Sequence, residues 1–267
     1  MQFKTRPTGA RSSLTQYNPS ISGSLNHSSA TPWLAHAYTA LGAVLALLAT
    51  LEVIAGDYRR AFIWLTVQVL VDATDGLLAR RLRVKERLPQ FDGARLDDIV
   101  DYLCYVFVPV LLLLRANLLP AAWGVAIASA VLLSSAYGFS QTAAKRLTTD
   151  HFFTGFPSYW NVVAFYLYLL EWPPAANAAV LLVLALLVFV PLRYIYPSRT
   201  RTFATLTTVL GGAWALLMLW MLWRLPAKDS HWIAVSLVFP AYYMAASIRL
   251  DRRTRAVDHS ITRSVDQ

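Results

Sequence analysis

Four aspartates stand inside two stretches that are otherwise apolar enough to cross a membrane. They are Asp72, Asp75, Asp97 and Asp101, within the strings VDATDGLLAR (71–80) and GARLDDIVD (93–101). A carboxylate near the centre of a bilayer costs about 2.5–3.5 kcal/mol on insertion scales, so four would cost roughly 10 kcal/mol unless they shared cations or faced a wet cavity. These residues need a compensating partner, and a divalent cation is the one we expect.

The spacing of the aspartates suggests how they would meet. On a helix, residues three or four apart lie on one face, so each pair points from one side of its own span. Hard oxygen ligands without His or Cys favour Mg²⁺, Mn²⁺ or Ca²⁺, and two facing pairs could hold two ions bridged by a substrate diphosphate. From the aspartates alone, a proton or sodium pathway in a transporter, or Asp–Arg pairing across the bundle, explains the pattern equally well.

Small residues and one arginine accompany the aspartates. Gly76, Ala79 and Gly93 lie beside the Asp faces, and Arg80 follows Gly76 by one helical turn. In membranes, small residues usually indicate tight helix packing. Next to clustered carboxylates and an arginine able to grip a phosphate, they could equally leave room for a nucleotide.

The surrounding sequence predicts an all-α, polytopic membrane protein with about eight transmembrane helices. Of its 267 residues, 57% are hydrophobic and only 15% are charged, which is far more apolar than a soluble domain requires. A span needs about 20 apolar residues, and runs of about this length recur along the chain. They lie at roughly 33–56, 61–79, 96–114, 121–143, 156–172, 175–192, 203–223 and 231–248.

The basic residues predict the orientation. With eight spans, both termini lie on one side, and all 24 Lys and Arg residues fall on that side except Arg59, Arg60, Arg115, Arg224 and Lys228. Cytoplasmic loops carry the positive excess, so we expect both termini, the 80–95 loop and the polar site on the cytoplasmic side. This topology and anionic headgroups explain the net charge of +9 without nucleic acid.

Three regions follow from this division. Residues 1–30 are rich in Ser, Thr, Asn and Gly and are expected to form a flexible or interfacial arm. Residues 31–250 form the predicted membrane domain. Residues 251–267 form a basic tail that we expect in the cytoplasm.

The motif residues together resemble the signature of the CDP-alcohol phosphotransferases. They form D-x2-D-G-x2-A-R-x12-G-x3-D-x3-D between residues 72 and 101, and all eight positions match. The family usually has eight residues between the arginine and the second glycine; the twelve here, 81–92, are similar to the bacterial phosphatidylcholine synthases. The resemblance extends to TTDHFFTGFPSYWN (148–161) and FVPLRYIYPSRTR (189–201), and covers about residues 33–250.

The resemblance implies a reaction in which CDP-diacylglycerol and choline give phosphatidylcholine and CMP, with Mn²⁺ or Mg²⁺ as cofactor, as two ions. Asp72, Asp75 and Asp97 would be metal ligands, and Asp101 would complete the metal site and accept the proton of the choline hydroxyl. Gly76, Ala79, Arg80 and Gly93 would line the CMP pocket. The resemblance also implies a multi-pass protein of the bacterial inner membrane, among membrane lipids, and relatives with this motif often pair as homodimers.

Choline carries a fixed positive charge without an N–H donor, so its pocket should use aromatic faces and a carboxylate. As candidates we take Tyr105, Phe153 and Trp160, with Asp98 or Asp150 as counter-charge, although ordinary core packing explains any single aromatic residue. A basic set near predicted span ends could hold the lipid diphosphate, and topological anchoring explains each of its members as well. This set comprises Lys145, Arg193, Arg199 and Arg201.

Two alternatives stay open. Within the family, the acceptor could be serine, glycerol phosphate or inositol phosphate; a phosphorylated acceptor calls for extra basic residues, whereas Phe152, Phe153 and Trp160 favour a cation. From another class, a cation transporter could use the aspartates as a relay. A transporter leaves the spacing of Gly76, Arg80 and Gly93 unexplained, and it would form no CMP.

Overall fold

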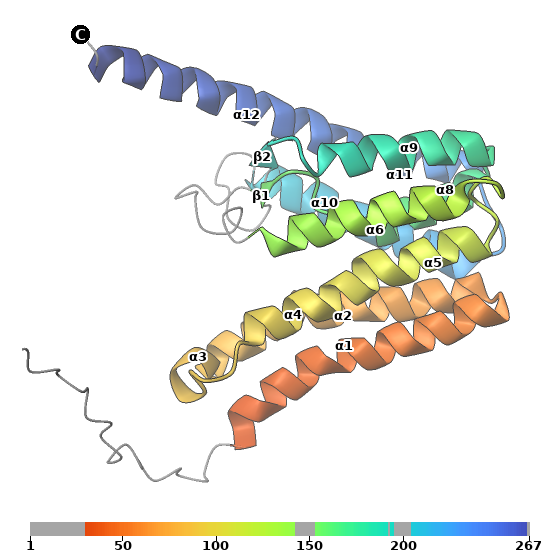
Figure 1. Cartoon of the computed structure of the whole chain (residues 1–267), viewed down its shortest axis with the longest axis horizontal. Helices are drawn as coiled ribbons and strands as arrows, with labels where there is room; N and C mark the ends of the chain where they lie inside the picture. The colour runs from red at the N-terminus through yellow and green to blue at the C-terminus, as the bar shows by residue number, and fades with distance from the viewer. Residues whose placement is uncertain (1–29, 142–152, 192, 195–203, 266–267) are drawn as a thin grey trace, which may run out of the picture.

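A computed structural model describes residues 30–141, 153–191, 193–194 and 204–265 of the chain. Within these residues the chain is a bundle of helices whose long axes run broadly alongside one another (Figure 1). A single two-stranded antiparallel ladder of β1 (Phe153–Thr154) and β2 (Arg193–Tyr194) adds to the helices, with Phe153 opposite Tyr194.

The first two helices form an antiparallel hairpin. α1 (Ala30–Ala55) packs along α2 (Tyr58–Arg81), and the turn between them passes through Gly56. Gly56 has φ +80°, a left-handed conformation that glycine adopts without a steric penalty. Asp57 then begins α2, because its side chain accepts a hydrogen bond from the backbone N–H of Arg60. The hairpin thus returns the chain to the end of the bundle where α1 starts.

The third long helical segment, residues 93–115, contains a π-helical turn. A short helix, α3 (Val84–Arg87), precedes α4 (Gly93–Asp101), which continues through η1 (Tyr102–Phe107) into α5 (Val108–Arg115). Pro109 lacks the N–H that would bond to the carbonyl of Tyr105. The N–H of Val108 bonds instead to the carbonyl of Leu103, five residues back. The wider turn directly follows Asp101 and contains Tyr105.

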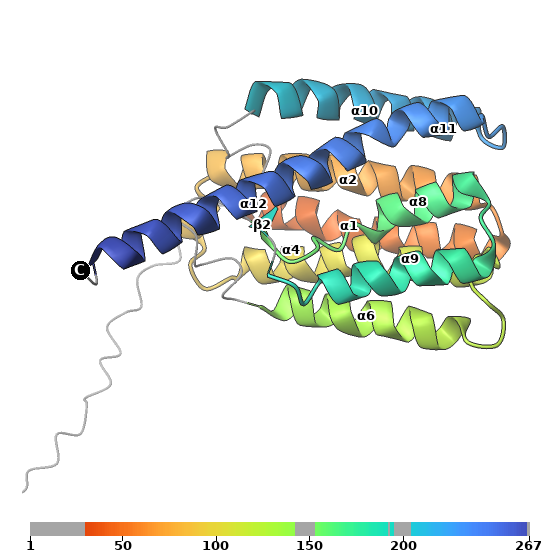
Figure 2. The same cartoon turned by 90° about the horizontal axis from the view of Figure 1, so that it is seen from above.

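The remaining helices complete the bundle. α6 (Gly124–Ser140) packs against α9 (Pro174–Leu187), and α8 (Trp160–Leu170) packs against α5. α10 (Ala204–Arg224) and α11 (Ser230–Ser236) lead to α12 (Val238–Val265), which crosses the bundle and extends beyond it (Figure 2). The β1–β2 ladder lies at the same end as α3 and the start of α4 (Figures 1 and 2).

Helices occupy all eight of the apolar ranges predicted as spans. Within the described residues, four helices are long and apolar enough to cross a membrane: Thr31–Ala55, Tyr58–Arg81, Thr205–Arg224 and Ser230–Arg252. Three others are apolar but shorter. A helical membrane protein is therefore confirmed, and the count of eight transmembrane helices stays a prediction.

The structure departs from the sequence prediction at two boundaries. The helix expected at 156–172 begins only at Trp160, because β1 and a left-handed residue, Ser158, come first. α12 continues through Val265 and so includes most of the range predicted as a basic tail. The predicted arm, residues 1–30, lies outside the described residues except for its last position.

Candidate active site

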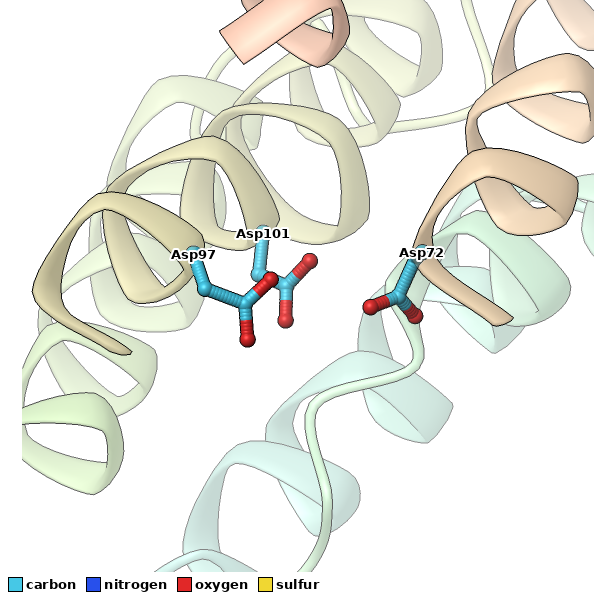
Figure 3. Close-up of side chains that lie close together, drawn as sticks. All are labelled: Asp72, Asp97 and Asp101. Carbon is cyan, nitrogen blue, oxygen red and sulfur yellow. The ribbon is translucent and has the colours of Figure 1, made fainter. Parts of the chain in front are cut away.

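Three of the four aspartates come together between two helices. Asp97 and Asp101 extend from α4, one turn apart on one face, and Asp72 faces them from α2 (Figure 3). One carboxylate oxygen from each residue lies within 4.8 Å of the others, and all three side chains are half-buried. Such close carboxylates repel one another, so the arrangement requires a cation or shared protons.

The donor set fits a divalent metal ion. It consists of carboxylates alone, the ligands preferred by Mg²⁺ and Mn²⁺. The Oδ1 atom of Asp101 is buried and has no hydrogen-bond partner, a costly state for a carboxylate oxygen that an ion would relieve. Asp72, Asp97 and Asp101 are therefore suited to hold such an ion.

Asp75 points to α1 instead. Its Oδ2 accepts a hydrogen bond of 2.7 Å from the hydroxyl of Thr39, and it does not belong to the group of three. It remains near enough to interact electrostatically with Asp72 and Asp101. The residues that precede Thr39 and Asp75 form a second hydrogen bond between the two helices: the hydroxyl groups of Tyr38 and Thr74 lie 2.8 Å apart. α1 thus holds the end of α2 that carries the aspartates.

Tyr105 supports Asp72. The tyrosine is buried, and its hydroxyl donates a 2.8 Å hydrogen bond to Oδ2 of Asp72. The sequence suggested a choline contact for this ring, but the hydroxyl is committed to the carboxylate. Partners that orient a metal ligand in this way commonly affect metal affinity by 10–100-fold.

Tyr105→Phe is expected to raise the Mn²⁺ concentration needed for half-maximal activity by about tenfold, because Asp72 loses the donor that orients it. The measurement is a Mn²⁺ titration of the initial rate. Tyr102→Phe is the matched control, since Tyr102 lies on the same helical segment but donates to the carbonyl of Leu132 on α6. An equal shift in both variants would contradict the role of Tyr105.

Two of the residues predicted to bind the nucleotide, Gly76 and Arg80, lie against each other. A Cβ built on Gly76 would lie 3.3 Å from Nη1 of Arg80, so the guanidinium group folds back over the glycine. Arg80 is exposed and Ala79 is half-buried. A Cβ at position 76 would require the end of the Arg80 side chain to shift by a few tenths of an ångström.

Gly93 has a packing role that the motif did not reveal. A Cβ at this position would lie 2.6 Å from Cε1 of His36, a buried residue of α1. His36 also contacts Phe91, with ring centroids 4.3 Å apart, and Phe91 contacts Trp33 at 5.4 Å. These aromatic contacts hold the end of the 81–92 segment against α1, and Gly93 allows the close approach.

Gly93→Ala is therefore expected to lower the melting temperature by several degrees and the activity by about tenfold, since overpacking costs about 1–3 kcal/mol. The double variant Gly93→Ala with His36→Ala should recover most of both losses. Gly212→Ala is the control, because no atom lies within 4 Å of a Cβ there. If removing the His36 ring gave no recovery, the glycine would be needed for another reason.

The structure describes some of the residues predicted to bind choline or the lipid diphosphate, and others lie outside the described residues. Trp160 is fully buried, and its indole N–H donates a 2.7 Å hydrogen bond to Ser135, which places it in the core. Asp98 is half-buried beside Asp97. Phe153 and Arg193 are placed only through the backbone of the β1–β2 ladder. Outside the described residues lie Lys145, Asp150, Arg199 and Arg201.

Several of these contacts were missed from sequence. The polar residues His36, Tyr38 and Thr39 are clustered in a mostly apolar helix, and that pattern was the available signal. Nothing in the sequence pairs Tyr105 with Asp72, which lies 33 residues earlier.

Comparisons with known proteins identify the family of this chain. A family model described as CDP-alcohol phosphatidyltransferase matches residues 33–191, which include the whole aspartate motif. A phosphatidylcholine synthase of Pseudomonas aeruginosa is 38% identical over 82% of this chain and 93% of its own. A phosphatidylcholine synthase of Legionella pneumophila is 36% identical over 80% of this chain and 86% of its own. One of Bradyrhizobium diazoefficiens is 40% identical over 70% of this chain and 69% of its own. The chain therefore belongs to the CDP-alcohol phosphatidyltransferase family.

Proposed function

We propose that this protein transfers the phosphatidyl group of CDP-diacylglycerol to choline, giving phosphatidylcholine and CMP. The observation that carries the proposal is the meeting of Asp72, Asp97 and Asp101 within a complete family motif. The identity of the acceptor rests on the relatives, which are named phosphatidylcholine synthases and align over most of their length.

The reaction is a single in-line displacement. The choline hydroxyl attacks the phosphorus of the phosphatidyl group, the bond from that phosphorus to the CMP oxygen breaks, and CMP leaves on the opposite side. Asp101, which would give one carboxylate oxygen to the ion, accepts the hydroxyl proton on its other oxygen. The segment 72–101 contains no Ser, Cys or His that could form a covalent intermediate, which supports the direct route.

Asp72, Asp97 and Asp101 would hold Mn²⁺ or Mg²⁺, and Asp75, whose Oδ2 accepts from Thr39, would give its other oxygen to a second ion. When bound, the metal would neutralise the diphosphate and stabilise the charge that develops on CMP. Arg80, folded over Gly76 on the same helix as Asp72, would bind a phosphate of the substrate. Arg80 lies over Gly76 and the His36 ring lies against Gly93, so these two glycines would shape the CMP pocket through the neighbours that they admit.

The site lies on the cytoplasmic side of a bacterial inner membrane, in a bundle that crosses the membrane eight times and has both termini in the cytoplasm. In support of this, the basic 80–95 segment directly precedes Asp97 and Asp101 in the sequence, and α3 within it lies at one end of the bundle (Figure 1). Choline and CMP are soluble, so a site at this end exchanges them with the cytoplasm while the lipid chains stay in the bilayer.

An acceptor panel tests the proposal. Purified protein in detergent is given CDP-diacylglycerol and Mn²⁺ with choline, serine, glycerol phosphate, inositol phosphate or no acceptor, and both CMP and the lipid product are measured. We expect CMP release and phosphatidylcholine with choline alone. A product with another alcohol would keep the family and overturn the acceptor. Absence of CMP with every acceptor would favour a cation transporter.

A further inference from the structure

Tyr159 lies beside the carboxylates, although it is outside the motif. It directly precedes α8, and its ring meets the ring of Tyr105 edge to face, with centroids 6.2 Å apart and planes at 65°. The hydroxyl of Tyr105 in turn donates to Asp72. A single aromatic ring therefore separates Tyr159 from the carboxylate site, while 45% of Tyr159 remains exposed.

The two neighbours of Tyr159 fix its position. Ser158 and Trp160 are buried, and both side chains donate hydrogen bonds to the hydroxyl oxygen of Ser135 on α6, at 3.3 and 2.7 Å. Ser158 has φ +53°, a left-handed conformation that costs about 1–2 kcal/mol outside glycine, and these bonds stabilise it. With its neighbours turned to α6, Tyr159 is left facing Tyr105.

Four neighbouring aromatic residues make contacts of their own. Tyr102 donates to the carbonyl of Leu132, Phe156 packs on Trp160, and Trp160 has no exposed surface. Tyr105 is buried with its hydroxyl on Asp72. Tyr159 is thus an exposed ring in direct contact with the tyrosine that donates to Asp72.

The chemistry of the acceptor gives this ring a role. The hydroxyl of choline must lie at Asp101, and its ammonium group, two carbons away, has no N–H to donate. A cation within about 6 Å of an aromatic centroid is attracted to the ring face, and the negative charge of the carboxylates adds to this attraction. Resting on the proposed function, we infer that Tyr159 binds the quaternary ammonium group of the acceptor and thereby selects choline over uncharged alcohols.

Two substitutions of Tyr159 test the inference. Tyr159→Leu removes the ring and should raise both the KM for choline and the inhibition constant of tetramethylammonium about tenfold, with the KM for CDP-diacylglycerol unchanged. Tyr159→Phe keeps the ring and should hold both values within about twofold of wild type. Tyr137→Leu is the matched control, because Tyr137 is 48% exposed and contacts Phe189 instead of a site residue.

The outcomes separate this inference from the proposed function. A Tyr159→Leu variant that forms phosphatidylcholine with unchanged choline and tetramethylammonium constants would overturn the inference alone. A parallel rise of both KM values, with a lower melting temperature, would assign Tyr159 a structural role and also overturn it. Wild-type protein that formed no phosphatidylcholine would refute the proposed function before the variants were compared.

Discussion

Asp101→Asn is expected to lower the rate of phosphatidylcholine formation about a thousandfold. The amide cannot accept the choline proton, and general-base catalysis alone is worth about 10²–10⁴-fold. It is also a weaker ligand for a hard cation than the carboxylate it replaces, so more Mn²⁺ should be required, but the defect due to the lost base should persist at saturating Mn²⁺. The shape of the side chain hardly changes, so the fold should survive. The measurement is kcat with saturating choline and CDP-diacylglycerol.

Asp92→Asn provides the matched control for that variant. Asp92 precedes α4 on the same segment, is exposed, and caps the helix by accepting from the backbone N–H of Arg95. Asparagine caps a helix about as well as aspartate, so the rate should stay within about twofold of wild type. If Asp101→Asn retained a rate close to that of this control, Asp101 would not be the base.

Removal of divalent ions is expected to have the second large effect. With a chelator in excess, phosphatidylcholine formation should fall to background, because the close carboxylates of Asp72, Asp97 and Asp101 would then lack the charge that offsets them. Added Mn²⁺ should restore the rate in the wild-type protein.

Asp97→Ala extends this prediction to one ligand. The loss of one of three clustered carboxylates should raise the Mn²⁺ concentration for half-maximal activity at least about tenfold. The measurement is a Mn²⁺ titration after chelator treatment, beside the Asp92→Asn control. Full activity in the chelator, or an unchanged titration in Asp97→Ala, would show that these residues serve the reaction without a metal ion.

The sequence predicted what depends on local geometry. Asp97 and Asp101 share a helix face because they are four residues apart, and the apolar runs found the helices because burial in a membrane demands them. Pro109 was visible in the sequence, but the π-helical turn before it depends on how the freed carbonyl is compensated.

Contacts between helices could not be predicted in the same way. The rotation of α2 against α1 turns Asp75 toward Thr39 and leaves Asp72 facing α4, and two aspartates three apart allow either choice. The hydrogen bond from Tyr105 to Asp72 depends equally on packing between distant segments. Trp160 resembled a choline residue by type, yet it is fully buried and its indole N–H donates to Ser135 on α6.

The most direct test of the account is the stoichiometry of the transfer. Purified protein in liposomes that contain CDP-diacylglycerol and Mn²⁺ is given labelled choline, and CMP and labelled phosphatidylcholine are counted in the same samples. The account predicts one CMP for each phosphatidylcholine and no CMP without choline. Release of CMP that does not depend on choline, or choline uptake without CMP, would contradict a direct transfer of the phosphatidyl group to choline.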